Sequence, residues 1–314
     1  MGGIHHVTAI SGKASRSVDF YKRTLGLRLV KKIVNFDDPR TYHLYFGDEQ
    51  GNPGTILTFF PWEDAAPGRN GDGLTEETAF RVPADSIGYW THRLIEKGVP
   101  HQALEKRFGE PVLSLTDPDG MSLALVGVAD ASSEPAWSDG TIPAEHAVRG
   151  FHGVMLMLEK AAPTAAILTG VFGFEETLRE GYLVRYETSG GEPGKVVTIR
   201  ETEGFLPGRL GRGSVHHIAF RAADDAQQAE MAKKVSEDYG LMPTEQLDRN
   251  YFRSVYFREP GGILFEIATD QPGFAVDEPV ATLGHELKLP PFLEFQRDEI
   301  EASLPPIEEI ERAA

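Results

Sequence analysis

The sequence contains one pattern twice, Ile4-His5-His6-Val7-Thr8-Ala9-Ile10 near its start and Ser214-Val215-His216-His217-Ile218-Ala219-Phe220 further along. Each copy places two adjacent histidines at the start of a short apolar segment, which is typical of a buried strand. Similar apolar segments at residues 80–82 and 154–158 bring the number to four. Because self-similarity along a chain indicates repeated structural units, we infer the fold from these four segments.

Each apolar segment is followed by the same succession of patterns. A helix-like stretch comes first, over residues 17–25, 87–97, 165–172 and 226–239. Each stretch ends at a glycine flanked by apolar residues, and a glycine there adopts the left-handed conformation that terminates a helix. These glycines are Gly26, Gly98, Gly173 and Gly240. Strand-like segments follow, the last of them after a Pro-Gly or Pro-x-Gly turn, so the predicted unit is βαβββ.

The four predicted modules lie at about residues 1–62, 76–128, 150–203 and 214–270. Stretches rich in Gly, Ser, Ala, Asp and Pro at residues 65–75 and 129–143 are predicted to be linkers. The second of them joins the two halves of the chain, residues 1–143 and 144–270. Residues 271–314 hold several prolines and an acidic end, and they are expected to form an irregular C-terminal arm with one short helix at residues 297–303. The expected fold class is α+β.

Composition narrows the classes of function. The 314 residues suffice for one large domain or two, and the net charge of -17 argues against non-specific nucleic-acid binding. The sequence has no cysteine, which excludes iron–sulfur clusters and thiolate zinc sites. We find no signal-peptide pattern and no apolar run of the ~20 residues that a membrane span needs. A cytoplasmic enzyme without a membrane partner is therefore expected.

A candidate metal site comes from comparing equivalent positions of the modules. The residue before the apolar pair of the first strand is His6, Ala79, Gly153 and His217 in modules one to four. The corresponding residue of the last strand is Thr58, Ala124, Thr198 and Glu266. Only His6, His217 and Glu266 bind metals well, and two histidines with one carboxylate form the facial triad of non-haem Fe(II) oxygenases. The same set also suits Mn(II), or Zn(II) in a hydrolytic or isomerising site.

A structural role is the main alternative for these residues. A lone histidine at the start of a strand is more often a partly exposed polar residue than a metal ligand. Here the histidine pairs recur at equivalent positions, and Glu266 lies in the apolar segment Leu264-Phe265-Glu266-Ile267-Ala268. An unpaired carboxylate in such a strand is costly, so the combination favours a bound cation.

His152 competes with His6 and His217 for the role of ligand. It stands in Phe151-His152-Gly153-Val154, where it matches His5 and His216 in register. A shift of one residue turns a side chain to the other face of a strand, so Gly153 occupies the ligand position instead. The site is therefore predicted between modules one and four, and modules two and three form a second cup without a metal.

The four βαβββ units resemble the vicinal-oxygen-chelate superfamily, which includes glyoxalases, extradiol ring-cleavage dioxygenases and antibiotic-resistance binding proteins. The resemblance covers residues 4–270 and implies four modules in two paired, cup-shaped mixed sheets. The whole chain is similar to the hydroquinone ring-cleaving dioxygenases of the 2,6-dichlorohydroquinone 1,2-dioxygenase type. The motifs are the two histidine segments, the Glu266 strand, and Val276-Asp277-Glu278-Pro279 with Leu289-Pro290-Pro291 in the tail.

This second resemblance implies a non-haem Fe(II) dioxygenase of extradiol type that inserts O₂ into a hydroquinone ring. It also implies roles beside the metal for a set of polar residues: His5, Thr8, His216, Arg249 and Tyr256. A histidine can act as acid or base, a tyrosine can hydrogen-bond a phenolate, and an arginine can stabilise developing negative charge. From the residues alone, Arg249 is as well explained as a solvated loop cation and Tyr256 as a packing residue of a hairpin.

Two other functions of the same fold remain open. A glyoxalase-type isomerase or lyase usually holds its metal with more carboxylates, and the equivalent positions Thr58 and Ala124 have none. A non-catalytic small-molecule binding protein, such as those that sequester antibiotics, usually lacks the ligand set. The expected partners are a small aromatic substrate and O₂, without nucleic acid, and a homo-oligomer is compatible with the sequence.

Overall fold

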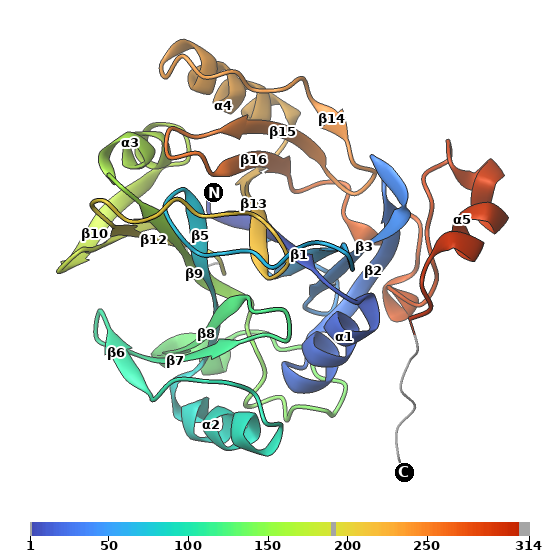
Figure 1. Ribbon diagram of the computed structural model, residues 1–314, viewed down its shortest axis with the longest axis horizontal. Helices are drawn as coiled ribbons and strands as arrows, with labels where there is room; N and C mark the ends of the chain where they lie inside the picture. The colour runs from blue at the N-terminus through green and yellow to red at the C-terminus, as the bar shows by residue number, and fades with distance from the viewer. Residues whose placement is uncertain (1, 190–192, 308–314) are drawn as a thin grey trace.

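The computed structural model describes residues 2–189 and 193–307, and its strands form two eight-stranded sheets (Figure 1). The first sheet has the order β14 (Leu247–Asp248), β15 (Arg253–Arg258), β16 (Leu264–Thr269), β13 (Ser214–Ala222), β1 (Ile4–Ser11), β4 (Ile56–Pro61), β3 (Asp38–Gly47), β2 (Arg28–Asn35). The second has the order β10 (Phe174–Glu180), β11 (Leu183–Thr188), β12 (Val196–Glu201), β9 (Phe151–Leu158), β5 (Leu74–Pro83), β8 (Ser122–Val128), β7 (Glu110–Thr116), β6 (Glu105–Arg107).

Each sheet joins two groups of four strands through their first strands. In the first sheet β1 pairs antiparallel with β13, and in the second β5 pairs antiparallel with β9. Within every group the first strand pairs parallel with the last, as β1 does with β4 and β13 with β16. The predicted α+β fold of βαβββ units in two curled mixed sheets is confirmed.

The helices lie close to the predicted stretches and differ mainly at their ends. They are α1 (Ala14–Asp19), continued by the π-helical turn η1 (Phe20–Thr24), α2 (Ile87–Glu96), α3 (Ala162–Gly170), α4 (Asp225–Glu237) and α5 (Arg297–Ser303). Short 3₁₀ turns are η2 (Ala84–Ser86), η3 (Ala129–Ser133), η4 (Phe274–Val276), η5 (Val280–Thr282) and η6 (Glu294–Gln296). All four glycines expected to end helices have positive φ, between 64° and 73°. None of the described helices is long and apolar enough to cross a membrane.

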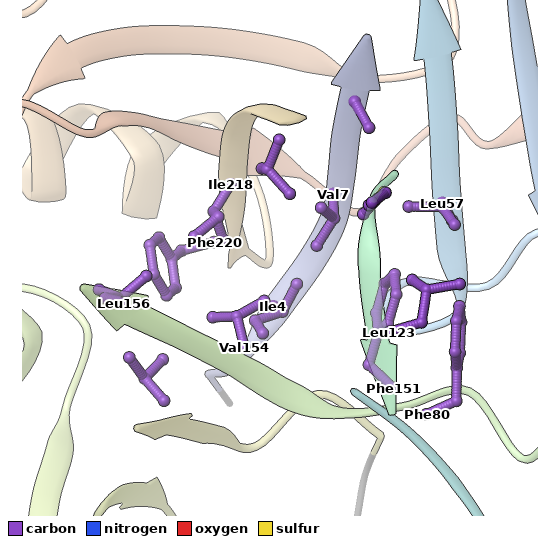
Figure 2. Packing of buried hydrophobic residues seen from close by; sticks show 14 of the residues in the cluster. Ile4, Val7, Leu57, Phe80, Leu123, Phe151, Val154, Leu156, Ile218 and Phe220 are labelled. Atoms are coloured by element: carbon purple, nitrogen blue, oxygen red, sulfur yellow. The ribbon is translucent and has the colours of Figure 1, made fainter. Parts of the chain in front are cut away.

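The main hydrophobic core lies where the two sheets meet. Figure 2 shows side chains of both sheets in contact, with Ile4, Val7, Leu57, Ile218 and Phe220 from the first and Phe80, Leu123, Phe151, Val154 and Leu156 from the second. All ten are at most 3% exposed. Full burial of a side chain of this size contributes roughly 1.5–3 kcal/mol. Because strand residues alternate between faces, the opposite face of each sheet is left for a site.

The C-terminal arm packs against β2 and β3 (Figure 1). Lys31 of β2 is fully buried, and its Nζ lies 2.8 Å from both Asp277 Oδ1 and Glu278 Oε2. The hydroxyl of Tyr251 donates a 2.8 Å hydrogen bond to Asp277 Oδ2. The arm thus holds the segment before β15, which carries residues of the candidate site.

Candidate metal centre

Three side chains converge on the concave face of the first sheet, from β1, β13 and β16. Glu266 Oε2 lies 3.2 Å from His6 Nε2 and 3.0 Å from His217 Nε2. The three are 2%, 4% and 0% exposed for His6, His217 and Glu266. Among the described residues, they form the one group of three or more His, Asp or Glu whose ligand atoms lie within 4.8 Å of each other.

Strand register explains why His6 and Glu266 meet. Across the antiparallel pair β1 and β13, His6 lies opposite Ala219, and across the parallel pair β13 and β16, Ala219 lies beside Glu266. The three residues therefore form one row on one face of the sheet. The small side chain of Ala219 leaves the space between the imidazole and the carboxylate free.

A second row mirrors the first. His217 lies opposite Thr8, and Thr8 lies beside Thr58 of β4. The two groups of four strands are related by an approximate two-fold axis between β1 and β13, so Thr58 occupies the position equivalent to Glu266. The site consequently has three ligand side chains and a hydroxyl where a second carboxylate would stand.

The ligand set fits a divalent cation. Neither oxygen of the buried Glu266 carboxylate has a hydrogen bond to any described residue, and a buried carboxylate without a partner is costly. Ligands held at about 2.1 Å from one ion and at right angles lie about 3.0 Å apart, which matches the measured distances. Burial opposes ionisation of Glu266, but His6 and His217 hold the pKa of this carboxyl well below its usual range when their Nε2 atoms carry protons, and a bound cation would take the place of those protons.

His5 lies behind the ligand His6. The two Nδ1 atoms are 2.9 Å apart, and the His5 ring also donates to the backbone carbonyl of Thr269. We assign the latter bond to His5 Nε2, because Nδ1 faces His6. His5 Nδ1 is then an acceptor, so His6 donates its Nδ1–H and its Nε2 lone pair faces Glu266. Burial, followed by the nearby His6, lowers the pKa of His5 well below its usual value, which keeps the ring neutral.

His216 has the same relation to His217. Their Nδ1 atoms are 2.8 Å apart, and the ring of His216 also packs edge-on against Phe60 and Trp62. Burial and the adjacent His217 lower the pKa of His216 to about 4, so it is neutral near pH 7. Hydrogen bonds of this kind fix the tautomer and orientation of a metal-binding imidazole.

A cavity opens over the ligands. It is lined by His6, Ile33, Asn35, Phe36, Asp37, His43, Tyr45, Phe60, His217, Arg249, Phe252 and Tyr256. Of the residues expected beside the metal, the structure brings Arg249 and Tyr256 to the cavity, whereas His5, Thr8 and His216 are not among its lining residues. The apolar part of the lining consists of Ile33, Phe36, Phe60 and Phe252, and the other lining residues are polar or charged.

Arg249 and Tyr256 approach the ligands from the β15 side. Tyr256 lies beside Glu266 in the β15–β16 register, and the Arg249 guanidinium lies 5.6 Å from the centre of the Tyr256 ring. Burial and the nearby Glu266 raise the pKa of Tyr256 above its usual value, so the hydroxyl stays protonated and can donate. Asn250, which follows Arg249, has φ of 67°, and this left-handed turn presents the arginine to the cavity.

His43 and Tyr45 were not predicted from the sequence. His43 Nε2 lies 2.7 Å from Thr58 Oγ1, and His43 Nδ1 lies 2.9 Å from the hydroxyl of Tyr45. Thr58 in turn donates a 3.0 Å hydrogen bond to Thr8 Oγ1. The structure thus places the predicted Thr8 behind Thr58, in this hydrogen-bonded chain. Neither residue lies in the first or last strand of its module, where the candidate ligands stand. Alternation in β3 was the available signal, because His43 and Tyr45 share the face opposite to Leu44.

The structure corrects one assignment in the second sheet. Ala79 was predicted as the module-two equivalent of His217. Ala79 lies opposite Gly153, as Ala219 lies opposite His6, so Glu77 is the equivalent of His217. Positions two apart share a strand face, and the apolar pattern by itself does not distinguish them. Aligning the glycines before the two strands, at positions 73 and 213, would have given the correct register.

The concave face of the second sheet, called the second cup below, holds ion pairs instead. Glu77 accepts from both terminal nitrogens of Arg107, at 2.6 and 3.0 Å. His152 Nε2 lies 3.3 Å from Glu110. A bulge between Phe151 and Gly153 leaves His152 on the same concave face as Gly153, so the expectation that it turns to the opposite face is wrong. At Gly153 an added Cβ would lie 2.1 Å from the carbonyl oxygen of Val196, so a histidine equivalent to His6 has no room there.

Comparison with known proteins agrees with this fold. Residues 3–125 match the Glyoxalase/Bleomycin resistance protein/Dioxygenase superfamily. The chain is 46% identical over 307 residues to the Bacillus subtilis protein named "Putative ring-cleaving dioxygenase MhqO", covering 98% of this chain and 96% of that protein. The chain belongs to this superfamily.

Other members of the superfamily span the whole chain as well. The "Chlorohydroquinone/hydroquinone 1,2-dioxygenase" of Sphingobium indicum is 37% identical over 307 residues, 95% of this chain and 94% of that one. A crystal structure of a "putative dioxygenase" from Bacillus subtilis has a TM-score of 0.94 at 44% identity, covering 99% and 98% of the two chains. Glyoxalase I from Zea mays has a TM-score of 0.69 at 14% identity, covering 91% and 98%, and supports the fold alone.

Proposed function

We propose that the protein is a non-haem Fe(II) dioxygenase of extradiol type that uses O₂ to cleave the ring of a hydroquinone. The observation that carries this proposal is the set His6, His217 and Glu266, with Thr58 where a second carboxylate would stand. Three protein ligands leave positions on the ion for substrate and O₂. The names of the relatives support the same reaction class, because they include ring-cleaving dioxygenases and a hydroquinone 1,2-dioxygenase.

Fe(II) is the proposed metal, with Mn(II) as the alternative. Two neutral imidazoles and one carboxylate leave the bound ion with a net charge near +1, which a phenolate oxygen nearly cancels. When bound, Fe(II) would relay electrons from the bound hydroquinone, which is the reductant, to O₂.

The side chains of the protein position the reactants and move protons. His5 and His216 accept hydrogen bonds from the ligand imidazoles and so hold their Nε2 atoms towards the ion. The protonated hydroxyl of Tyr256 can donate to a ring oxygen, and the Arg249 cation can stabilise negative charge as the ring opens. The apolar side chains of Ile33, Phe36, Phe60 and Phe252 offer packing surfaces to an aromatic ring in the cavity.

The decisive experiment is O₂ uptake by protein that has been loaded anaerobically with Fe(II). We expect kcat/KM for a hydroquinone to exceed that for catechol by at least ~10-fold, which corresponds to about 1.4 kcal/mol. Tyr256→Phe should lower this ratio, whereas Tyr182→Phe, in the turn between β10 and β11, should leave it unchanged. A preference for catechol would reject the hydroquinone assignment, and turnover of a glyoxalase substrate without O₂ uptake would favour an isomerase.

A further inference from the structure

His43 and Tyr45 of β3 give the cavity a polar wall, and neither residue has a role in the reaction proposed above. In the first sheet the ligands stand on β16, β13 and β1, with Tyr256 beside them on β15 and His43 and Tyr45 on β3 at the other flank. The other lining residues of that flank are the apolar Ile33, Phe36 and Phe60 and the polar Asn35 and Asp37. The carboxamide oxygen of Asn35 accepts a hydrogen bond from the backbone N–H of Asp37, and the exposed Asp37 carboxylate lies 3.8 Å from the Arg249 guanidinium. The two polar groups of β3 are therefore available to a polar atom of the substrate that points away from Tyr256.

Symmetry of the sheet relates the two flanks. Tyr45 lies beside Thr58 as Tyr256 lies beside Glu266, and Thr58 is the equivalent of Glu266. Tyr45 is thus the module-one equivalent of Tyr256. One tyrosine stands on each side of the metal ligands, and both line the cavity.

Hydrogen bonds determine which group Tyr45 offers to a ligand. The Thr58 hydroxyl donates its hydrogen bond to Thr8. The Thr58 oxygen therefore accepts a hydrogen bond from His43 Nε2–H, with 2.7 Å between the nitrogen and the oxygen. His43 Nδ1 then carries no proton and accepts a 2.9 Å hydrogen bond from the Tyr45 hydroxyl. The free lone pair of the Tyr45 oxygen remains as an acceptor. The ring of His43 is further held between the rings of Tyr45 and Phe60, with centres 4.1 and 4.4 Å away.

We propose that His43 and Tyr45 determine specificity for hydroquinones, an inference that rests on the proposed function. The two oxygens of a hydroquinone are para to each other, so one reaches the metal and the other must be received by the protein. Tyr45 accepts a hydrogen bond from that second hydroxyl, and His43 is the positioning residue that orients Tyr45. A hydroxyl buried in this cavity without a partner would weaken binding by roughly 10-fold or more.

Anaerobic calorimetry on the Fe(II)-loaded protein tests this assignment without requiring turnover. The ligands are hydroquinone and phenol, which both offer one oxygen to the metal but differ in the second hydroxyl. We expect the wild type to bind hydroquinone at least ~10-fold more tightly than phenol. Tyr45→Phe and His43→Leu should bring this ratio close to one. His43→Asn, which keeps an acceptor near the position of Nδ1, should recover part of it.

Misfolding or loss of iron in a variant would also change the binding ratio, so both are measured. Circular dichroism and iron content should match the wild type for every variant, and His152→Leu in the second cup should leave the binding ratio unchanged. Unchanged ratios in both Tyr45→Phe and His43→Leu would overturn the inference, as would a wild type that binds both ligands equally. Selective binding that is lost in the variants, in a protein that consumes no O₂, would support the inference and reject the proposed reaction.

Discussion

Replacing Glu266 by Gln keeps the size of the side chain and removes the only charged ligand at the proposed metal site. In the wild type, a metal that binds only the folded state stabilises it by about 2.7 kcal/mol at a free concentration one hundred times Kd. Unfolding entropy is about 2.1 cal/mol/K per residue near 60 °C, which amounts to about 0.66 kcal/mol/K for 314 residues. The expected rise in the unfolding midpoint is therefore about 4 °C, or about 8 °C if modules one and four, which form the first sheet, unfold separately from the rest.

Thermal unfolding followed by circular dichroism, with and without Mn(II), measures this rise and avoids oxidation of iron in air. We expect a shift below about 1 °C in Glu266→Gln, because a neutral carboxamide is a poor replacement for the carboxylate. Glu77→Gln is the matched control, since Glu77 is a buried carboxylate of the second cup that is paired with Arg107. Its baseline stability should fall while its metal-dependent shift remains. A full shift in Glu266→Gln would refute the ligand assignment.

Three further predictions concern other parts of the molecule. His6→Ala should abolish binding of Fe(II) in equilibrium dialysis and His152→Ala should retain it; the reverse would place the metal in the second cup. Lys31→Met leaves Glu278 buried without its cation and should lower the free energy of unfolding in urea by about 3–5 kcal/mol, with Lys97→Met as the exposed control. Burial alone would raise the pKa of Glu110, but His152 and the guanidinium of Arg185 lower it to about 2. Its contribution to stability is therefore present above about pH 4.5 and is lost as the pH falls towards 2, so the stability difference between wild type and Glu110→Gln should shrink over that range. A difference that grows in acid would contradict this sign.

Much of the fold could be predicted because its signals are local. The apolar strands, the helices and the glycines that end them repeat along the chain, and each depends on residues within a few positions of one another. The candidate ligands could be predicted for the same reason, since a carboxylate in an apolar strand is unusual wherever that strand lies. Glu266 and the two histidine pairs required no knowledge of strand neighbours.

Tertiary structure decided which side chains share a cavity with these ligands. Alternation along a strand separates its two faces, but the pairing of strands distant in sequence determines what each face meets. His43 reaches the site because β3 lies two strands away from β1. His5 contacts His6 where β1 has a bulge between Ile4 and His6, and its ring donates to the backbone carbonyl of Thr269. The equivalence of Glu77 with His217 also depended on the β5–β9 register, a contact between strands that no local pattern reports.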